Sequence, residues 1–305
     1  MLTVELRQLE HFVAVAGELS FTKAARRIHV VQSALSTSVA KLERELGVRL
    51  FDRSRQQITL TPAGERFRSH AQGVLSSARS AAESVADYRG TLSGTVEFGS
   101  LISFGPMDVA RVLGDFHRAH PFVRLRLRLD QSGASAYLGA LLEGALDLAL
   151  VSVPDRRPAH LDLRLMFEEP MVFVCRSDHP VAPRAGIGVA ELADEDLIGF
   201  PPEFGLRRLM DGAFHAAGLH PRTLHEVPAG FAAVADLVAH GLGTAFMPAS
   251  EAARFPGLVS VPLAHPVLWQ VYLAAPPAER VSPATAQLAA MLEHEARGGR
   301  DRAGG

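Results

Sequence analysis

The chain has 305 residues, 48% of them apolar, which is enough to build a buried core and excludes a disordered protein. A single cysteine excludes an intramolecular disulfide and a four-cysteine metal site, and no apolar run reaches the roughly 18 residues of a membrane span. The net charge of −2 is unevenly divided. Residues 1–90 carry 13 basic and 9 acidic side chains, and the remainder carries 18 and 24. A basic front and an acidic back suggest that the front binds nucleic acid.

Residues 6–47 predict three helices. Apolar side chains recur at helical spacing in 6–16, 21–28 and 35–46. Ser20 stands at the N-cap position of the second helix, and Gly47 ends the third. Two short helices joined by a tight turn, the second with a polar outer face, are the pattern of a helix-turn-helix.

A short β-hairpin, or wing, is predicted to follow from residues 48–51 and 58–60, around a polar and basic tip. Together with the third helix it supplies side chains suited to DNA. For base edges in the major groove we expect Gln32, Ser33, Ser36 and Thr37. For phosphates we expect Lys41, Arg44, Arg53 and Arg55.

A long helix is predicted from residue 62, because Thr61 can cap it and Pro62 suits its first position. Its apolar residues step alternately by four and three, as in a heptad seam: Phe67, Ala71, Val74, Ala78, Ala81, Val85 and Tyr88. A stripe this narrow needs a partner helix. We expect the same helix of a second subunit, and the alternative is a helix that lies on its own domain.

Five motifs in this front region keep their order and spacing without a gap: Leu9-x-x-Phe12, Ser20-Phe21-Thr22-x-Ala24-Ala25, Gln32-Ser33-Ala34-Leu35-Ser36, Leu42-Glu43-x-x-Leu46-Gly47-x-x-Leu50-Phe51-x-Arg53 and Leu60-Thr61-Pro62-Ala63-Gly64. The set resembles the N-terminal signature of LysR-type transcriptional regulators. Val31 departs from that family, which usually has Ser or Thr before the Gln. Thr37-Ser38 also stand where many members carry longer polar or basic side chains.

The resemblance implies an N-terminal winged helix-turn-helix, mostly α, over 1–61, and a linker and dimerisation helix over 62–90. It also implies a two-lobed α/β effector-binding domain over 91–305 that folds like a periplasmic solute-binding protein. The expected first lobe is about 92–162 with 268–305, and the second is about 163–267.

The residue pattern of the back part independently predicts an α/β fold. Strands at 95–99, 123–129 and 146–151 alternate with helices at 106–120 and 137–144, as in βαβ units. Further strands are expected at 171–175, 197–200, 244–247 and 268–273, with helices at 207–217, 231–240 and 283–297. Three arginines alternate along 123–129, so we expect this to be an edge or half-exposed strand.

Ligands of open α/β sheets bind beyond the carboxyl ends of strands. The residues at those positions are the candidate effector-binding set: Ser100, Leu101, Ser103, Gln131, Ser132, Ser152, Phe200, Pro201, Phe204 and Phe231. Cations are scarce among these segments. We therefore expect a small, moderately polar effector with one carboxylate or none.

No catalytic motif, metal-ligand spacing or phosphate-binding loop is found, so we expect no enzyme activity, no metal and no cofactor. Cys175 ends an apolar strand and is expected to be a buried structural cysteine. The N-terminus has no signal core, which favours a cytoplasmic protein without membrane contact.

Two functions fit these observations. The first is a transcription regulator that binds double-stranded promoter or operator DNA and responds to a small-molecule effector. The resemblance implies a dimer, or a tetramer built as a dimer of dimers, and contact with RNA polymerase. The alternative is a small-molecule-binding or enzymatic α/β protein whose N-terminal helices serve only for dimerisation.

Overall fold

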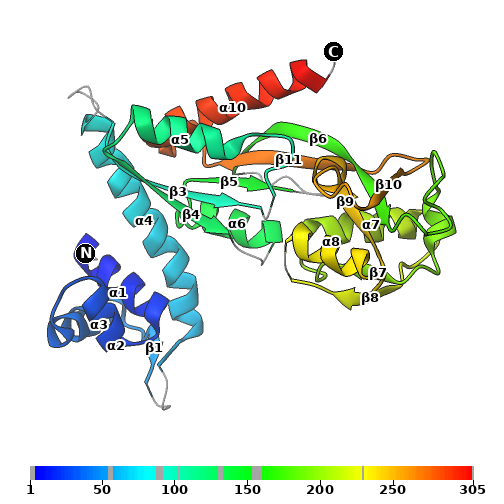
Figure 1. The fold of residues 1–305 in the computed structure, drawn as a ribbon. Coiled ribbons are helices and arrows are strands. Elements are labelled where there is room, and N and C mark those ends of the chain that lie inside the picture. Colours follow the sequence, from blue (N-terminus) through cyan, green and yellow to red (C-terminus); the bar gives the residue numbers. More distant parts are fainter. Residues whose placement is uncertain are drawn as a thin grey trace.

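The computed structural model describes residues 4–53, 58–86, 92–101, 103–129, 133–152, 160–228 and 230–303. A small helical head, a long helix and a larger α/β body follow one another along the chain (Figure 1). Among the helices of these residues, none is both long and apolar enough to cross a membrane.

The head contains α1 (Leu6–Glu18), α2 (Phe21–Arg27) and α3 (Gln32–Leu46), followed by the antiparallel strands β1 (Phe51–Asp52) and β2 (Thr59–Leu60). The predicted helix ends are confirmed. The Ser20 hydroxyl accepts the Lys23 amide at 3.3 Å, and Gly47 ends α3 in the left-handed region at φ +68°. Phe12 is fully buried at the centre, with its ring 5.3 Å from that of Phe51, so α1 and the wing share one core.

Helix α4 (Pro62–Ala86) leaves the head and runs to the body (Figure 1). Its predicted cap is confirmed, because the Thr61 hydroxyl accepts the Gly64 amide at 3.0 Å. Only glycine fits at position 64, since a Cβ there would lie 2.1 Å from the Leu50 carbonyl oxygen. The start of α4 is thereby held against the wing.

The body is one nine-stranded sheet with strand order β4-β3-β5-β11-β6-β9-β7-β8, and β10 pairs with β6. Its strands are β3 (Gly94–Ser100), β4 (Val123–Leu129), β5 (Leu148–Val151), β6 (Asp162–Cys175), β7 (Leu197–Gly199), β8 (Thr223–Glu226), β9 (Thr244–Pro248), β10 (Val259–Pro262) and β11 (Leu268–Ala275). Its helices are α5 (Val109–Ala119), α6 (Gly133–Leu142), α7 (Gly205–Ala216), α8 (Phe231–Ala239), α9 (Ala249–Ala252) and α10 (Pro283–Ala303). Two 3₁₀ turns lie at Val189–Leu192 and Ala278–Arg280.

Two strands join the halves of the body. Strand β6 pairs with β11 up to Pro170, and from Met171 it pairs with β9 and β10. The parallel strands β3, β4 and β5 therefore form one lobe and β7, β8 and β9 another, with β6 and β11 crossing between them. The lobe boundary expected near residue 162 falls at the first residue of β6, which both lobes share.

Strand β4 is the outermost strand of the first lobe, as its three arginines predicted. Glu97 on the neighbouring β3 is only 10% exposed and forms ion pairs with Arg126 at 3.0 Å and Arg128 at 3.2 Å. The charges on this edge are thus partly neutralised within the lobe.

Candidate functional site

The outer face of α3 carries the side chains predicted to touch base edges. Gln32, Ser33 and Thr37 are exposed and Ser36 is half-buried, while the opposite face of the helix is buried in the head. The N-cap residue of α3 is Val31, which is 70% exposed and makes no side-chain cap hydrogen bond. Because no side chain caps them, the first amides of α3 remain able to donate to a phosphate.

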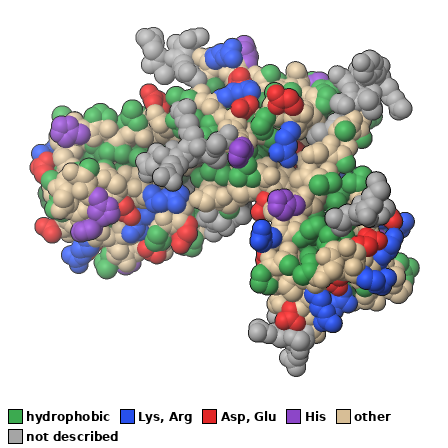
Figure 2. Space-filling model, turned by 180° about the vertical axis from the view of Figure 1, so that it is seen from behind, with side chains coloured by type: hydrophobic (Ala, Val, Ile, Leu, Met, Phe, Trp, Pro, Cys, Tyr) green, Lys and Arg blue, Asp and Glu red, His purple; other side chains and the backbone are tan. Residues whose placement is uncertain are grey.

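Basic side chains surround this face. Figure 2 shows Lys and Arg side chains gathered over the lower edge of the head. Of the predicted phosphate contacts, Arg44 is exposed and makes no hydrogen bond or ion pair within the described part of the chain. Arg55 lies outside the described residues. Five further cations of the head are exposed and were not among the predicted contacts, although their charge was visible in the sequence: Arg7, Lys23, Arg26, Arg27 and Arg49.

Arg53 and Lys41 are held by other side chains of the head. The Arg53 guanidinium lies 3.3 Å from a Glu43 carboxylate oxygen and 4.8 Å from the centre of the Phe21 ring. The other oxygen of Glu43 accepts two backbone amides of the wing. Lys41 forms an ion pair with Glu5 at 2.9 Å, and this pairing raises the pKa of Lys41. Glu43 therefore fixes Arg53 and the wing relative to α3.

The heptad seam of α4 divides into two parts. Ala71 is fully buried in the core of its own head, and the half-buried Phe67 packs its ring 5.1 Å from Phe12. Ala71 has no surface left for a second subunit, because α1 covers it. Val74 is 49% exposed, Ala78 is half-buried and Ala81 is exposed. The side chain of Val85 and all of Tyr88 lie outside the described residues, so pairing through the seam stays a prediction.

Three of the candidate effector residues come together as an aromatic cluster in the second lobe. The rings of Phe200 and Phe204 are stacked with centroids 5.3 Å apart, and Phe231 meets Phe200 edge-on at 5.3 Å. They come from the end of β7, the start of α7 and the start of α8, which is the strand-end position that the sequence indicated. Pro201, in the same segment, is half-buried.

Ser152 at the end of β5 meets the second lobe directly. A Cβ at Gly205 would lie 3.3 Å from the Ser152 carbonyl oxygen, so the first turn of α7 touches the first lobe here. Beside this contact is an open groove of about 390 Å³ between α7 and the crossing strand β11. Its size is within the range of small-molecule sites.

Ser100, Leu101 and Ser103 follow β3 in the first lobe. Ser100 is 3% exposed and its hydroxyl has no partner among the described residues, while Leu101 is half-buried. The Ser103 hydroxyl donates to Glu251 of α9 at 2.5 Å, which links the first lobe to the second. The other two candidates, Gln131 and Ser132, lie outside the described residues.

A pair of buried carboxylates that the sequence did not indicate lies beside Ser103. Glu251 is 5% exposed, and Glu169 on β6 is 7% exposed and accepts the amide and hydroxyl of Ser250. Burial raises the pKa of Glu169, and the negative charge of Glu251 raises it further. No local pattern could reveal the link between Ser103 and Glu251, since 148 residues separate them.

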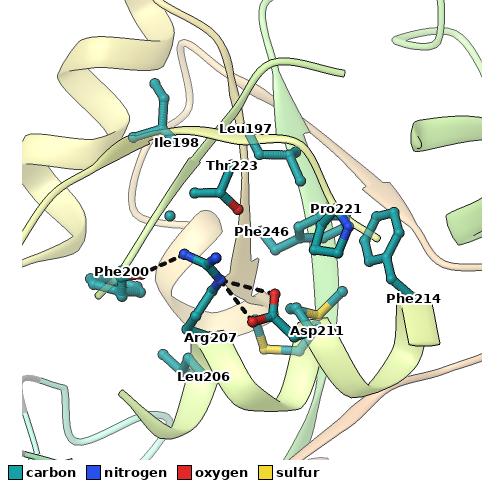
Figure 3. A pocket seen from close by; sticks show the side chains of 13 residues that line it. Leu197, Ile198, Phe200, Leu206, Arg207, Asp211, Phe214, Pro221, Thr223 and Phe246 are labelled. Carbon is teal, nitrogen blue, oxygen red and sulfur yellow. Dashed lines mark hydrogen bonds and ion pairs between the residues drawn. The ribbon is translucent and has the colours of Figure 1, made fainter. Parts of the chain in front are cut away.

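Arg207 is the cation closest in sequence to the aromatic cluster, and acidic side chains beside it already neutralise its charge. Figure 3 shows its guanidinium turned toward Asp211, whose two oxygens it contacts at 2.9 Å, and toward the Phe200 carbonyl oxygen at 3.1 Å. Glu226 lies 3.3 Å away. The cavity beside Arg207 measures about 30 Å³, enough for one or two water molecules and too small for an organic effector.

Cys175 is fully buried in β6, as expected. Burial raises the pKa of its thiol to about 11. A thiol of that pKa is almost entirely protonated at neutral pH and is a poor nucleophile.

A winged helix-turn-helix head, a long helix and a two-lobed α/β body together define a DNA-binding regulator with a ligand-sensing domain. Comparison with known proteins agrees. Residues 6–65 match the family description "Bacterial regulatory helix-turn-helix protein, lysR family", and residues 89–297 match "LysR substrate binding domain". The chain belongs to the LysR family of transcriptional regulators.

Relatives are similar over most of their length. The chain is 34% identical to the HTH-type transcriptional regulator ShiR of Corynebacterium glutamicum over 79% of this chain and 82% of ShiR. It is 30% identical to the DNA-binding transcriptional dual regulator OxyR of Escherichia coli over 81% of this chain and 79% of OxyR.

Solved structures share the whole architecture. A full-length OxyR variant from Pseudomonas aeruginosa superposes with a TM-score of 0.72 at 26% identity, covering 96% of this chain and 95% of that one. Full-length CbnR in complex with its target DNA, at 24% identity, has the same fold, with a TM-score of 0.64 and coverage of 96% and 100%. The protein is thus a sequence-specific DNA-binding transcription regulator with a second domain that binds an effector.

Proposed function

We propose that the protein acts as a homodimer, or a pair of dimers, in which α4 places two heads on a pseudo-palindromic operator. The exposed polar face of α3 beside the Glu43-anchored Arg53 is the observation that carries this proposal. In this arrangement Gln32, Ser33, Ser36 and Thr37 reach base edges. Lys41, Arg44, Arg53 and Arg55 meet phosphates, and Val74, Ala78 and Ala81 contact the partner helix.

The proposed effector site lies between the lobes. From the first lobe it includes Ser100, Leu101, Ser103 and Ser152, and from the second Phe200, Pro201, Phe204 and Phe231. Gln131 and Ser132, which lie outside the described residues, stay candidates on the sequence alone. The aromatic cluster favours an effector with an apolar part. Arg207 is neutralised by Asp211, and Glu169 and Glu251 add negative charge near Ser103. These charges favour a neutral or weakly acidic effector over a dicarboxylate.

The proposed regulator senses this molecule without a reactive cysteine. The relatives include proteins named as hydrogen peroxide-inducible genes activators. The single thiol of this chain is buried, and its pKa of about 11 suppresses the thiolate. The protein acts in the cytoplasm, catalyses no reaction and controls transcription through contact with RNA polymerase.

Binding to DNA at two salt concentrations tests this function. We expect the full-length protein to bind a labelled fragment from upstream of its own gene or its neighbour more tightly than a scrambled fragment. Its affinity should fall by orders of magnitude between 50 and 200 mM salt. Arg53→Ala with Arg55→Ala should weaken binding and flatten the salt dependence, whereas Arg297→Ala, a 75% exposed arginine of α10, should change neither.

Absence of selective binding at any salt concentration would contradict the proposal and favour the alternative of a metabolite-binding α/β protein. Isothermal titration that shows tight binding of a dicarboxylate would contradict the proposed effector class.

A further inference from the structure

Helix α6 contacts the end of β3 through Tyr137 and the long helix α4 through the turn that follows it. It stands between the long helix α4 and the second lobe (Figure 1). Tyr137, midway along it, is 2% exposed, and its hydroxyl lies 2.5 Å from the Ser100 carbonyl oxygen and 3.2 Å from that of Arg128. Because Ser100 belongs to the proposed effector site, this hydroxyl ties α6 to the cleft.

The turn after the C-terminal end of α6 rests on α4. Gly144, just after the helix, has φ +70°, and a Cβ there would lie 2.8 Å from the Ser76 Cβ and 3.2 Å from the Gly73 Cα. The backbone of Gly144 therefore lies directly against the backbone of α4. A Cβ at position 144 would be closer to the Ser76 Cβ than Cβ contacts in proteins are. The turn is rigid, since the Ala145 amide donates to the Ala140 carbonyl at 2.7 Å and the Gly144 amide to Leu141 at 3.1 Å.

A second link lies next to this contact. The carboxylate of the half-buried Asp147 accepts the Glu97 amide at 2.8 Å, and the Asp147 amide donates to the Glu97 carbonyl at 2.9 Å. Burial raises the pKa of Asp147, and the positive charge of Arg79 on α4 opposes that rise. The start of β5 is thus held to β3 on one side and faces a charge of α4 on the other.

An open groove shows that the rest of this junction is loosely packed. It measures about 640 Å³ between α4 and the residues Leu142 and Arg280 of the first lobe. Val74 and Leu142, which line it, are 49% and 44% exposed. Motion of the first lobe relative to α4 would therefore be resisted mainly at Gly144 and not along the whole junction.

We propose that α6 transmits the state of the effector cleft to the DNA-binding heads, with the contact of Gly144 on Gly73 and Ser76 as the joint. A shift of the β3 end on effector binding moves Tyr137 and α6 as one body. The Gly144 turn then pushes on α4, whose other end is fixed to the head by Gly64 and Ala71. The inference rests on the proposed function, because it assumes that the heads bind DNA and that Ser100 faces the effector.

A matched pair of glycine variants tests the joint. Gly144→Ala adds a Cβ that must displace α4. Gly218→Ala is the control: it also follows a helix at a positive φ of +76°, but a Cβ there meets nothing within 4 Å. Both variants carry the same backbone strain, so only Gly144→Ala should alter the heads. We expect Gly144→Ala to change the bend angle of bound operator DNA and to shift operator affinity by about 5-fold or more, and Gly218→Ala to match the wild type.

Two further variants keep the test decisive. Ser76→Gly removes the nearest of the atoms that the new Cβ meets and leaves the contacts at 3.2 Å with the Gln72 carbonyl oxygen and the Gly73 Cα, so the double variant with Gly144→Ala should return part of the way to the wild-type bend angle. If Gly144→Ala does not fold, Ser76→Leu enlarges the same contact from the helix side without backbone strain, and the same shift is expected.

The outcomes separate the two proposals. A wild-type protein without selective DNA binding would contradict the proposed function. A wild-type protein that binds selectively, with Gly144→Ala and Ser76→Leu giving the wild-type bend angle, would overturn the joint while leaving the function intact.

Discussion

Val74 tests whether α4 pairs with a second copy of itself. In the single chain its side chain is 49% exposed, so a glutamate at this position stays in water and costs the monomer little. Glutamate is also a good helix former, which leaves α4 intact. In a symmetric pair of α4 helices each copy of this position lies in the shared apolar seam, so Val74→Glu places two carboxylates there.

The expected loss of affinity is large. Desolvation costs several kcal/mol for each ion. With about 5 kcal/mol in total, and about 1.4 kcal/mol for each factor of ten, the dimer dissociation constant rises roughly 4,000-fold. Loss of the second head should also weaken operator binding by about 10²–10⁴-fold, because bivalent attachment is gone.

Sedimentation equilibrium at micromolar concentration measures the result as a multiple of the 32.7 kDa chain. We expect Val74→Glu to lower the mass relative to the wild type. Val48→Glu is the matched control, since Val48 is 43% exposed just after α3 and off the seam. A Val74→Glu protein with the mass of the wild type would refute the heptad interpretation.

Three further predictions concern single groups. Val31→Thr should stabilise the head by about 1 kcal/mol, because it supplies the missing cap of α3, and a head melting temperature unchanged by it would count against an uncapped helix. Burial raises the pKa of Glu169, so folding favours its protonated form and stability is lost as pH rises through that raised pKa. Glu169→Gln keeps hydrogen-bond partners for Ser250. Near pH 4 the variant should therefore have the melting temperature of the wild type, and at pH 8 its melting temperature should be equal to or higher than that of the wild type. A lower melting temperature at pH 8 would contradict this. Cys175 should not react with a thiol reagent in the native protein at pH 8, and hydrogen peroxide should leave DNA binding unchanged.

Local signals in the sequence were enough for much of the head. Ser20, Gly47 and Thr61 are end signals whose chemistry acts within a few residues, and the structure places each at the end of a helix. The edge position of β4 was also predictable, because its alternating arginines cannot be buried on both faces.

Other features depend on contacts that no local pattern contains. The heptad spacing of α4 was visible in the sequence. The burial of Ala71 by α1 was not, because that contact depends on the packing of α1 against α4. The predicted strand at 171–175 is the last part of β6, whose first part includes charged residues and crosses between lobes. The short elements β8, α9 and β10 are too brief to show a period.

The candidate effector site was predicted in part. The sequence placed aromatic residues at the strand ends, and in the structure the rings of three of them pack against one another. The partner of Ser103 and the neutralisation of Arg207 follow only from the packed structure, because the groups involved come from separate elements.

Selection from a random pool of double-stranded DNA by the full-length protein is the most direct measurement of recognition by α3. We expect enrichment of a pseudo-palindrome with two half-sites on one face of the duplex, spaced by whole helical turns. It also predicts loss of that enrichment when Gln32 and Thr37 are both replaced by alanine while the fold is retained. A pool without any enriched sequence, or the same enriched sequence for the double variant, would contradict recognition by α3.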